Sequence, residues 1–542
     1  MQPKLLLCSL ILACSFALIS PFGGSLNLAT LTESVQVTTL SSSTGAILGA
    51  SVASCDFNND GKKDFIIGAP GDNSGAGVVT VLFGGRSLSA VDMANPMADG
   101  SGFLMTYSGA FYFGGKVVCI GDVNNDQIED IAIANNYGTE YLIVYGSGSY
   151  NADVDIASLS YPAVSSIARA GSTAFLVDVV GIGDTTGDDT DDFVIVLQDA
   201  FVYSALVFYG SIGATEIGDS PTPGVSFRLH NGPGQGAQIS ISSAGKFDGG
   251  DSLYDFAVGN LNGGTQVAVI FGNSAGYSDM DLSGGTFSLA TPQRVMWIND
   301  GGATSGFGNS VAYAGDINSD GFGDLLIGSP NAYSSFGAAF LIYGSNTFSA
   351  DISANDIQFG SGQGHIITHG TVSGLQGGFT VFGCQPTDTL TLCPAVAICD
   401  YSSTCIMIFT AGIASMPDTF DMDTMKSEDG FPVYNSLLMW TYPMQIAMAG
   451  NANGDAYPDY LIGQGNFGSS DGRAYIVFGL NKCTSPCKTC AGLLPADWTK
   501  CTSCESATDF LYNYACISSC PTHTYQSSSN TCSGREMFGK IE

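Results

Sequence analysis

A nine-residue acidic loop, followed at once by a short apolar stretch, recurs along this chain. The clearest copy runs from Asp316 to Asp324 and continues into Leu325-Leu-Ile327. Related loops begin at residues 56, 122, 184, 246, 316, 384 and 451, which lie 62 to 70 residues apart. Chance turns do not keep such a period, so the sequence predicts seven repeated structural units.

The loop offers the oxygen shell that a hard cation needs. Side chains at positions 1, 3, 5 and 9 and the carbonyl of position 7 can surround an ion, and Ca²⁺ fits such a set best. Asp, Asn and Gly also favour ordinary tight turns, so a pure turn role is the alternative. Five loops follow the pattern, and their predicted ligands are Asp56, Asn58, Asp60, Lys62 and Asp64; Asp122, Asn124, Asp126, Ile128 and Asp130; Asp184, Thr186, Asp188, Thr190 and Asp192; Asp316, Asn318, Asp320, Phe322 and Asp324; and Asn451, Asn453, Asp455, Tyr457 and Asp459. We expect about five Ca²⁺ sites, strongest in repeats one, two and five, because repeat three has a Thr ligand and repeat seven only two carboxylates.

Two copies of the loop are degenerate. The fourth has Lys246 at the first ligand position and one extra residue, so we predict that it binds no Ca²⁺. In the sixth, a disulfide from Cys384 to Cys393 is expected to close the loop that an ion closes elsewhere. A second bridge is predicted across the turn between Cys399 and Cys405. Cys55 and Cys119, which precede equivalent loops in neighbouring units, are expected to be buried thiols rather than a bridge.

Each unit also contains four predicted strands. A Gly-containing strand precedes the loop, an apolar strand follows it, a third ends in an aromatic residue and usually Gly, and a fourth completes the unit. Seven radial four-stranded units make a β-propeller. The seventh unit lacks residues for its outer strand, whereas a spare strand, Val35–Thr38, precedes the first loop. The prediction is an all-β, seven-bladed β-propeller over residues 26–480, closed by this N-terminal strand.

Charge and the N-terminus restrict the functional class. Asp and Glu number 49 against 16 Lys and Arg, which gives a net charge of −33 and excludes a nucleic-acid partner because no cationic surface is available. Lys4 followed by the apolar run Leu5–Ile19 indicates a signal peptide over residues 1–20, ending between 15 and 25. We expect a secreted or cell-surface protein without a direct membrane span.

A cysteine-rich tail is predicted over residues 481–542. It is expected to be a small module of four disulfides, although its two Cys-x-x-Cys pairs also suit a zinc ribbon. The signal peptide favours disulfides. The eight cysteines are Cys483, Cys487, Cys490, Cys501, Cys504, Cys516, Cys520 and Cys532.

Phe-Gly before the loops and Gly-Ala-Pro or Gly-Ser-Pro after them, as at Gly68–Pro70 and Gly328–Pro330, resemble FG-GAP repeats, the blades of the integrin α head. The resemblance implies Ca²⁺ loops on one face and partners on the opposite face or the rim. Leg domains and a membrane span do not follow residue 480, so an integrin-like head is expected rather than a whole subunit. The tail spacing resembles furin-like, growth-factor-receptor cysteine-rich repeats.

The functional expectation is a calcium-stabilised extracellular recognition or adhesion protein that binds a protein or matrix ligand. The alternative is a carbohydrate-binding propeller, in which Trp297 or Trp440 stacks on sugar rings. An enzyme, such as a secreted hydrolase related to the phospholipases that carry these blades, is disfavoured because His230, His365, His369 and His523 lie in no catalytic motif. His365 and His369 are expected on a solvated face of a strand.

Overall fold

The computed structural model describes the chain in segments. These are residues 26–27, 37–41, 46–85, 96, 100–135, 139–150, 152–160, 163–169, 175–199, 202–210, 215–217, 226–230, 239–249, 251–282, 294–300, 306–332, 337–348, 351–353, 362–368, 380–383, 395–399, 404–409, 419–421, 430–434, 444–450, 452, 459–465, 472–478, 487–490, 501–504, 510–512, 515–517, 524–526 and 532–534. The predicted signal peptide and the loop from Cys384 to Cys393 lie outside these residues.

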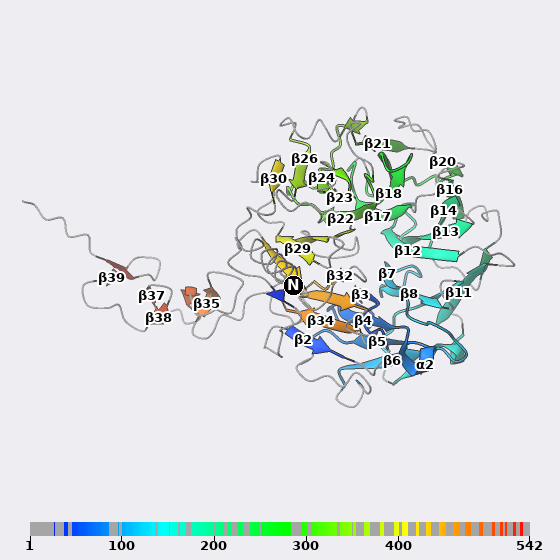
Figure 1. The fold of residues 1–542 in the computed structure, drawn as a ribbon, viewed down its shortest axis with the longest axis horizontal. Helices are drawn as coiled ribbons and strands as arrows, with labels where there is room; N and C mark the ends of the chain where they lie inside the picture. The colour runs from blue at the N-terminus through cyan, green and yellow to red at the C-terminus, as the bar shows by residue number, and fades with distance from the viewer. Residues whose placement is uncertain are drawn as a thin grey trace, which may run out of the picture.

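Seven sheets of these segments stand around a common centre, as the view down the short axis shows (Figure 1). The chain is therefore an all-β, seven-bladed β-propeller, as predicted. In each blade the chain runs outward through antiparallel strands. The inner strands are β3 (Ser51–Cys55), β7 (Val117–Gly121), β12 (Phe175–Gly183), β17 (Ser240–Gly245), β22 (Ser310–Gly315), β27 (Thr380–Phe382) and β32 (Gln445–Met448). The second strands are β4 (Asp64–Ala69), β8 (Asp130–Asn135), β13 (Asp192–Asp199), β18 (Asp255–Leu261), β23 (Asp324–Ser329), β28 (Ala395–Cys399) and β33 (Tyr460–Gln464).

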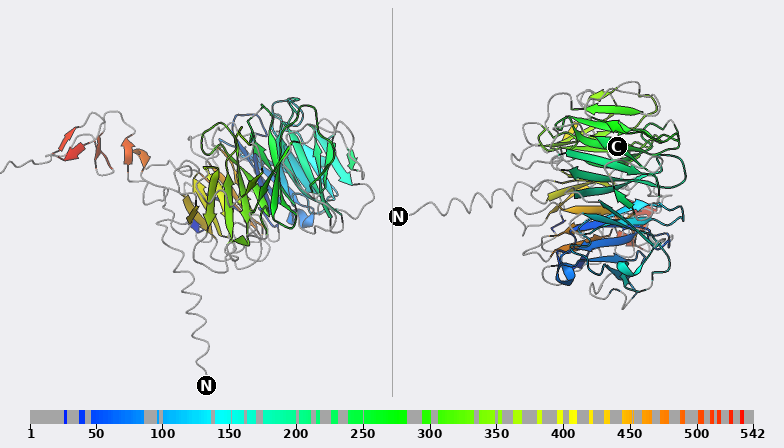
Figure 2. Two further views of the ribbon diagram at one scale, coloured as in Figure 1. Left: turned by 90° about the horizontal axis from the view of Figure 1, so that it is seen from above. Right: turned by 90° about the vertical axis from the view of Figure 1, so that its right-hand side faces the viewer.

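The outer half of each blade follows the same order. The third strands are β5 (Val78–Leu82), β9 (Glu140–Val144), β14 (Val202–Phe208), β19 (Gln266–Ile270), β24 (Ala338–Ile342), β29 (Thr404–Phe409) and β34 (Arg473–Val477). The fourth strands are β6 (Gly102–Thr106), β11 (Val164–Arg169), β16 (Ser226–His230), β21 (Val295–Asn299), β26 (Gly364–Thr368), β31 (Gly430–Tyr434) and, from the N-terminus, β2 (Val37–Leu40). Seen from its edge, the ring is a disc whose strands cross its thickness (Figure 2).

A fifth, parallel strand lies outside the fourth strand in six blades, which the sequence did not predict. In five blades it comes from the next unit, between that unit's third and fourth strands, and in blade six it comes from the N-terminus before β2, so it links the rims of neighbouring blades. An aspartate before it fixes this contact: Asp153 and Asp351 each accept the N–H of the neighbouring outer strand at 2.9 Å, from Leu104 and Trp297. The fifth strands are β10 (Val154–Asp155), β15 (Thr215–Ile217), β20 (Met280–Asp281), β25 (Ile352–Ser353), β30 (Thr419–Asp421) and β1 (Leu26–Asn27).

The N-terminal strand closes the ring, which confirms the prediction. β2 pairs antiparallel with β34 of blade seven, with Val37 opposite Val477 and Leu40 opposite Ala474. The described strand covers residues 37–40, and Val35 and Gln36 lie outside the described residues. Because blade seven takes its first three strands from the end of the repeat region and its fourth from the beginning, the two ends of that region are held in one sheet.

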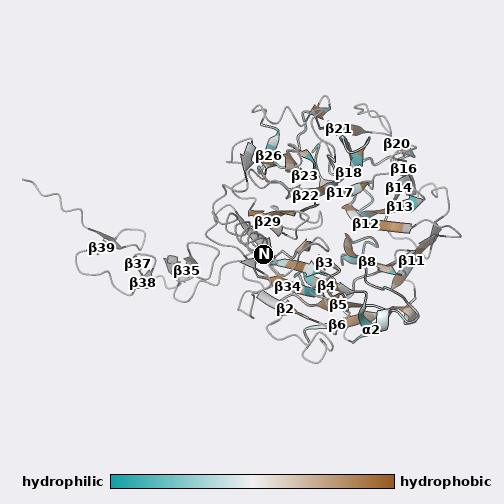
Figure 3. Ribbon diagram, viewed as in Figure 1, coloured by the Kyte–Doolittle hydropathy of each residue, from teal (hydrophilic) through white to brown (hydrophobic). Residues whose placement is uncertain are grey.

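The core lies between the sheets, because both faces of each blade pack against a neighbour. One buried cluster, for example, combines Phe57 and Phe103 of blade one with Leu142 and Val144 of blade two. Apolar residues gather on the strands of the ring (Figure 3). Neighbouring blades approach closely at a pair of glycines, since a Cβ on Gly68 would lie 2.0 Å from the carbonyl oxygen of Gly114. This contact gives a steric reason for the Gly in both halves of the repeated motif.

The disulfides correct one prediction and confirm another. Cys399 and Cys405 are bonded across the β28–β29 hairpin, as expected. Cys55 and Cys119 are also bonded, so the prediction of two free buried thiols was wrong. These residues lie on the inner strands of adjacent blades, where the strands converge on the hub and bring the two Cα atoms to 5.7 Å.

Helical structure is slight in the described residues, with a one-turn segment α2 (Asp72–Gly75) and a 3₁₀ turn η4 (Ile156–Ser158). No helix there is long and apolar enough to cross a membrane. Three two-stranded sheets follow the ring, and in the first of them Cys487 is opposite Cys504 and Cys490 opposite Cys501. The tail's disulfides stay a prediction. Its strands are β35 (Cys487–Cys490), β36 (Cys501–Cys504), β37 (Phe510–Tyr512), β38 (Ala515–Ile517), β39 (Thr524–Gln526) and β40 (Cys532–Gly534).

Candidate functional site

The acidic loops of blades one, two, three and five share one geometry, in which the chain turns around the first carboxylate. In blade five, Asp316 accepts the N–H groups of Asp320 at 3.0 Å and Gly321 at 2.9 Å. Asp56 makes the equivalent two bonds in blade one. Each loop joins the inner strand of its blade to the second strand, so all of them lie on one face of the disc. The predicted ligands of each loop are thus brought together.

The aspartate at position 9 ties the loop to the blade. Both oxygens of Asp324 accept backbone N–H groups, from Ile317 at 2.7 Å and from Gly344 at 3.0 Å. The residue is fully buried, and this burial raises the pKa of Asp324 to about 8, while its two hydrogen bonds act in the opposite direction. Burial likewise raises the pKa of Asp64 to about 8.

Positions 3 and 5 complete a set of oxygen donors at the loop mouth. Asn318 Oδ1 accepts the N–H of Asp320, and Asp320 Oδ1 accepts the N–H of Phe322, both near 3 Å. In blade three the hydroxyl of Thr186 occupies position 3, and it is buried without a hydrogen-bond partner. A buried polar atom without a partner is costly, and an ion at the loop centre would satisfy it. Carboxylate, amide, hydroxyl and carbonyl oxygens together fit Ca²⁺.

The remaining loops are described only in part. In blade seven Asp459 is fully buried, like the other residues at position 9, whereas Asn451, Asn453, Asp455 and Tyr457 lie outside the described residues. The fourth loop has Lys246 in place of the first aspartate, and its Asp248 and Asp251 pair with Arg294.

Sequence reasoning missed the acidic residue at position 8 of loops two and three, which connects each of these two loops to the previous one. Asp191 accepts the N–H of Asp122 at 2.8 Å and donates its own N–H to the carbonyl of Asp122 at 2.9 Å. Glu129 accepts the N–H of Asp56 and pairs with Lys63 at 2.7 Å. An acidic residue directly before position 9 is the only signal in the sequence. Its consequence is that neighbouring loops form a hydrogen-bonded chain along one face.

The opposite face carries the connections from second to third strands and from one blade to the next. Phe111, in the connection from β6 to β7, is 50% exposed, the large hydrophobic side chain most open to solvent in the described part of the chain. Backbone hydrogen bonds hold its loop in place, because the N–H groups of Tyr112 and Phe113 donate to the carbonyls of Gly75 and Ala76 at 2.9 Å. The structure therefore presents an aromatic ring on a loop held by hydrogen bonds, on the face opposite the acidic loops.

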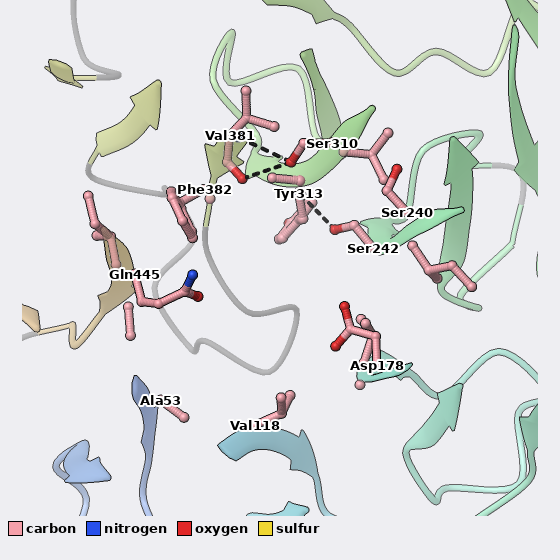
Figure 4. A pocket seen from close by; sticks show the side chains of 18 of the residues that line it. Ala53, Val118, Asp178, Ser240, Ser242, Ser310, Tyr313, Val381, Phe382 and Gln445 are labelled. Carbon is pink, nitrogen blue, oxygen red and sulfur yellow. Dashed lines mark hydrogen bonds between the residues drawn. The ribbon is translucent and has the colours of Figure 1, made fainter. Parts of the chain in front are cut away.

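A pocket of about 510 Å³ lies at the hub and is lined by residues of all seven inner strands (Figure 4). Gln445 and Asp178 point into it from different blades. Asp178 pairs with Lys116 of the neighbouring blade at 2.9 Å. Two wall residues are joined across blades, since Ser242 Oγ accepts the N–H of Tyr313 at 2.9 Å.

Two sequence expectations about exposed side chains were wrong. Trp297 is only 3% exposed and His365 only 4%, and the His365 ring lies edge-on to Tyr343 with centroids 5.6 Å apart. Both residues lie on outer strands, but a blade packs against neighbours on both faces, so these strands have no solvated face. Trp440 and His369 lie outside the described residues, and so do His523 and the side chain of His230.

Comparison with known proteins agrees with this geometry. The FG-GAP repeat family model matches residues 48–82 and 307–342. Two units, those of blades one and five, thus match the FG-GAP repeat. It is also similar to Integrin alpha-3 of Cricetulus griseus, with 30% identity over 139 residues, which is 25% of this chain and 12% of that protein. It is 33% identical to Integrin alpha-6 of Gallus gallus over 98 residues, 17% of this chain and 9% of that protein. The matches thus span about a tenth of each relative's length.

Proposed function

We propose that this chain is a calcium-stabilised extracellular recognition protein whose metal loops keep one face of the propeller rigid while the opposite face binds a protein or matrix ligand. The observation that carries the proposal is the repeated oxygen cage, with a buried aspartate at position 9 in four described loops. The likeness to FG-GAP repeats and to integrin alpha chains supports an adhesion or recognition role in general, and it fits a binding protein rather than an enzyme.

Each ion would be held by the predicted side chains at positions 1, 3, 5 and 9 and by the carbonyl at position 7. When bound, Ca²⁺ supplies positive charge to a cluster of acids on a protein of net charge −33. The buried aspartates are then compensated, and the loop hydrogen bonds through Asp191 and Glu129 connect one site to the next. The ion acts on the framework and does not contact the ligand.

Recognition is assigned to the face that carries Phe111. Binding to a rigid surface loses little conformational entropy, so a loop already fixed by backbone hydrogen bonds suits an interface better than a mobile one. An exposed aromatic residue is also a frequent energetic centre of protein interfaces. The carbohydrate alternative loses one of its two proposed platforms because Trp297 is buried.

The test is surface plasmon resonance of the purified secreted chain against a panel of purified extracellular-matrix proteins. Each protein is measured in buffer with 1 mM CaCl₂ and again in buffer with EGTA. We expect a matrix protein to bind in calcium, binding to weaken about tenfold or more with Phe111→Ser, and no change with Ser149→Ala, a substitution on the metal-loop face. Full binding by the Phe111 variant would show that the face is assigned wrongly. Binding on a glycan array, without any matrix protein, would instead support the carbohydrate alternative.

A further inference from the structure

The fourth loop keeps the frame of the metal loops although its first carboxylate is missing. Asp255 accepts the N–H of Asp248 at 3.0 Å and the N–H of Gly272 at 2.8 Å. Asp324 makes the same two kinds of bond in blade five. Counting back from the buried aspartate therefore places Asp251 at position 5. Lys246 stays at position 1, because its carbonyl accepts the N–H of Gly323 as the carbonyl of Asp122 accepts that of Asp191, so the extra residue falls between positions 1 and 5.

Position 5 of the fourth loop is Asp251. Its Oδ1 accepts the N–H of Leu253, two residues later, at 3.0 Å. Asp320 Oδ1 accepts the N–H of Phe322 at the same distance in blade five. The second oxygen of Asp251 thus corresponds to Asp320 Oδ2, which would face the cation proposed for blade five.

The guanidinium group of Arg294 forms an ion pair with this second oxygen of Asp251. Nη1 of Arg294 lies 3.1 Å from Asp251 Oδ2 and also donates to the carbonyl of Gly272 at 3.1 Å. Nη2 of Arg294 is paired with Asp248, whose side chain is 11% exposed. The guanidinium carbon lies 5.4 Å from the ring centroid of Phe271, so the group is also held by an aromatic face. A planar, permanently charged fork suits two separate carboxylates better than an ammonium group does.

The position of Arg294 is occupied by neutral residues in the other blades for which it is described. In each case the carbonyl before the fourth strand accepts the N–H of the aromatic residue that ends the third strand, at 2.8 to 3.2 Å. The residues that accept this bond, and therefore stand at the position of Arg294 in their own blades, are Ser101, Ala163 and Gln363. Blades one, two and five, to which these belong, have a complete metal-ligand pattern. The cationic side chain thus coincides with the loss of the ligand pattern.

We propose that Arg294 is a built-in cation that replaces Ca²⁺ in the fourth loop and excludes a metal ion from it. The inference rests on the proposed calcium binding of the other loops. It assigns a role to a residue outside the repeated loop, about forty positions downstream, and makes blade four independent of external calcium. Removal of the guanidinium leaves two neighbouring carboxylates, one of them mostly buried, without their partner, which is more costly than removal of both charges together.

The first experiment counts bound Ca²⁺ by equilibrium dialysis and metal analysis of the full chain and two variants. Lys246→Asp restores the first carboxylate but leaves Arg294 in place, so it should bind the same number of ions as the natural chain. The double variant with Lys246→Asp and Arg294→Gln should bind one more. An extra ion in Lys246→Asp alone, or none in the double variant when the natural chain binds Ca²⁺, would overturn the proposal.

The second experiment measures Tm in EGTA and separates this proposal from the calcium function. Arg294→Gln should lower Tm more than Lys116→Gln, which removes the cation of a more exposed ion pair. Combining Arg294→Gln with Asp248→Asn and Asp251→Asn should recover most of that loss; a triple variant as unstable as the single one would show that Arg294 acts by packing, which contradicts the proposal. If the natural chain binds no Ca²⁺, the calcium function fails, and these EGTA measurements still decide whether Arg294 compensates the two carboxylates.

Discussion

Removing the disulfide between blades one and two should destabilise the protein more than removing the one within blade six. Cys55 and Cys119 are 64 residues apart in sequence, so their bond closes a loop that contains most of blade one. Cys399 and Cys405 are only 6 apart. In the chain-entropy model, closing these loops reduces the entropy of the unfolded chain by amounts equivalent to about 4 kcal/mol and about 2 kcal/mol at 25 °C. The expected difference is therefore about 2 kcal/mol.

The two pairs are a matched comparison because all four cysteines are at most 1% exposed, so Cys→Ala removes similar packing in each case. The double variants would be compared in calcium by guanidinium denaturation followed by circular dichroism. Hydrogen exchange would locate the loss, which should appear in β3 and β7 for one variant and in β28 and β29 for the other. If the blade-six variant is equally or more destabilised, the argument from loop length does not hold for this propeller.

Three further predictions test the metal loops, a buried phenol and the blade contact. Asp320→Asn should reduce the rise of Tm produced by calcium, because one site adds about 2.7 kcal/mol to the free energy of unfolding when calcium is at one hundred times its dissociation constant, but should barely change Tm in EGTA; equal losses in both conditions would contradict a metal role. Burial raises the pKa of Tyr150 to about 12, so the folded state loses stability as pH rises from 10 through 12, and Tyr150→Phe should lose less over that range in Tm measurements; parallel curves would refute the assignment. Gly68→Ala places a methyl group 2.0 Å from the Gly114 carbonyl oxygen and should lower Tm well below that of Gly148→Ala, whose nearest contact is 3.3 Å; equal Tm values would show that the blades can move apart at little cost.

Much of the site was predictable because its geometry is local. An acidic loop is held by hydrogen bonds within nine residues, such as those from Asp320 and Gly321 to Asp316, so the residue types at fixed positions carry the information. The strand pattern is also local, and its repetition gave the number of blades. The N-terminal strand followed from counting, since the seventh unit lacked its fourth strand. The end of that strand lies at Leu40 rather than Thr38, because alternation along a short apolar stretch does not define where pairing stops.

The sequence by itself determined the repeating unit, the ring and the candidate cation ligands, since each depends on residues close together in the chain. Only the tertiary structure decided the bond between Cys55 and Cys119, the burial of Trp297 and the pairing of Arg294 with Asp251, a residue 43 positions away. These contacts form when whole blades and connections pack together, and the register of that packing is not written in any short segment. The fourth loop illustrates the difference: its sequence shows that the first carboxylate is missing, and the fold shows that Arg294 pairs with Asp248 and Asp251.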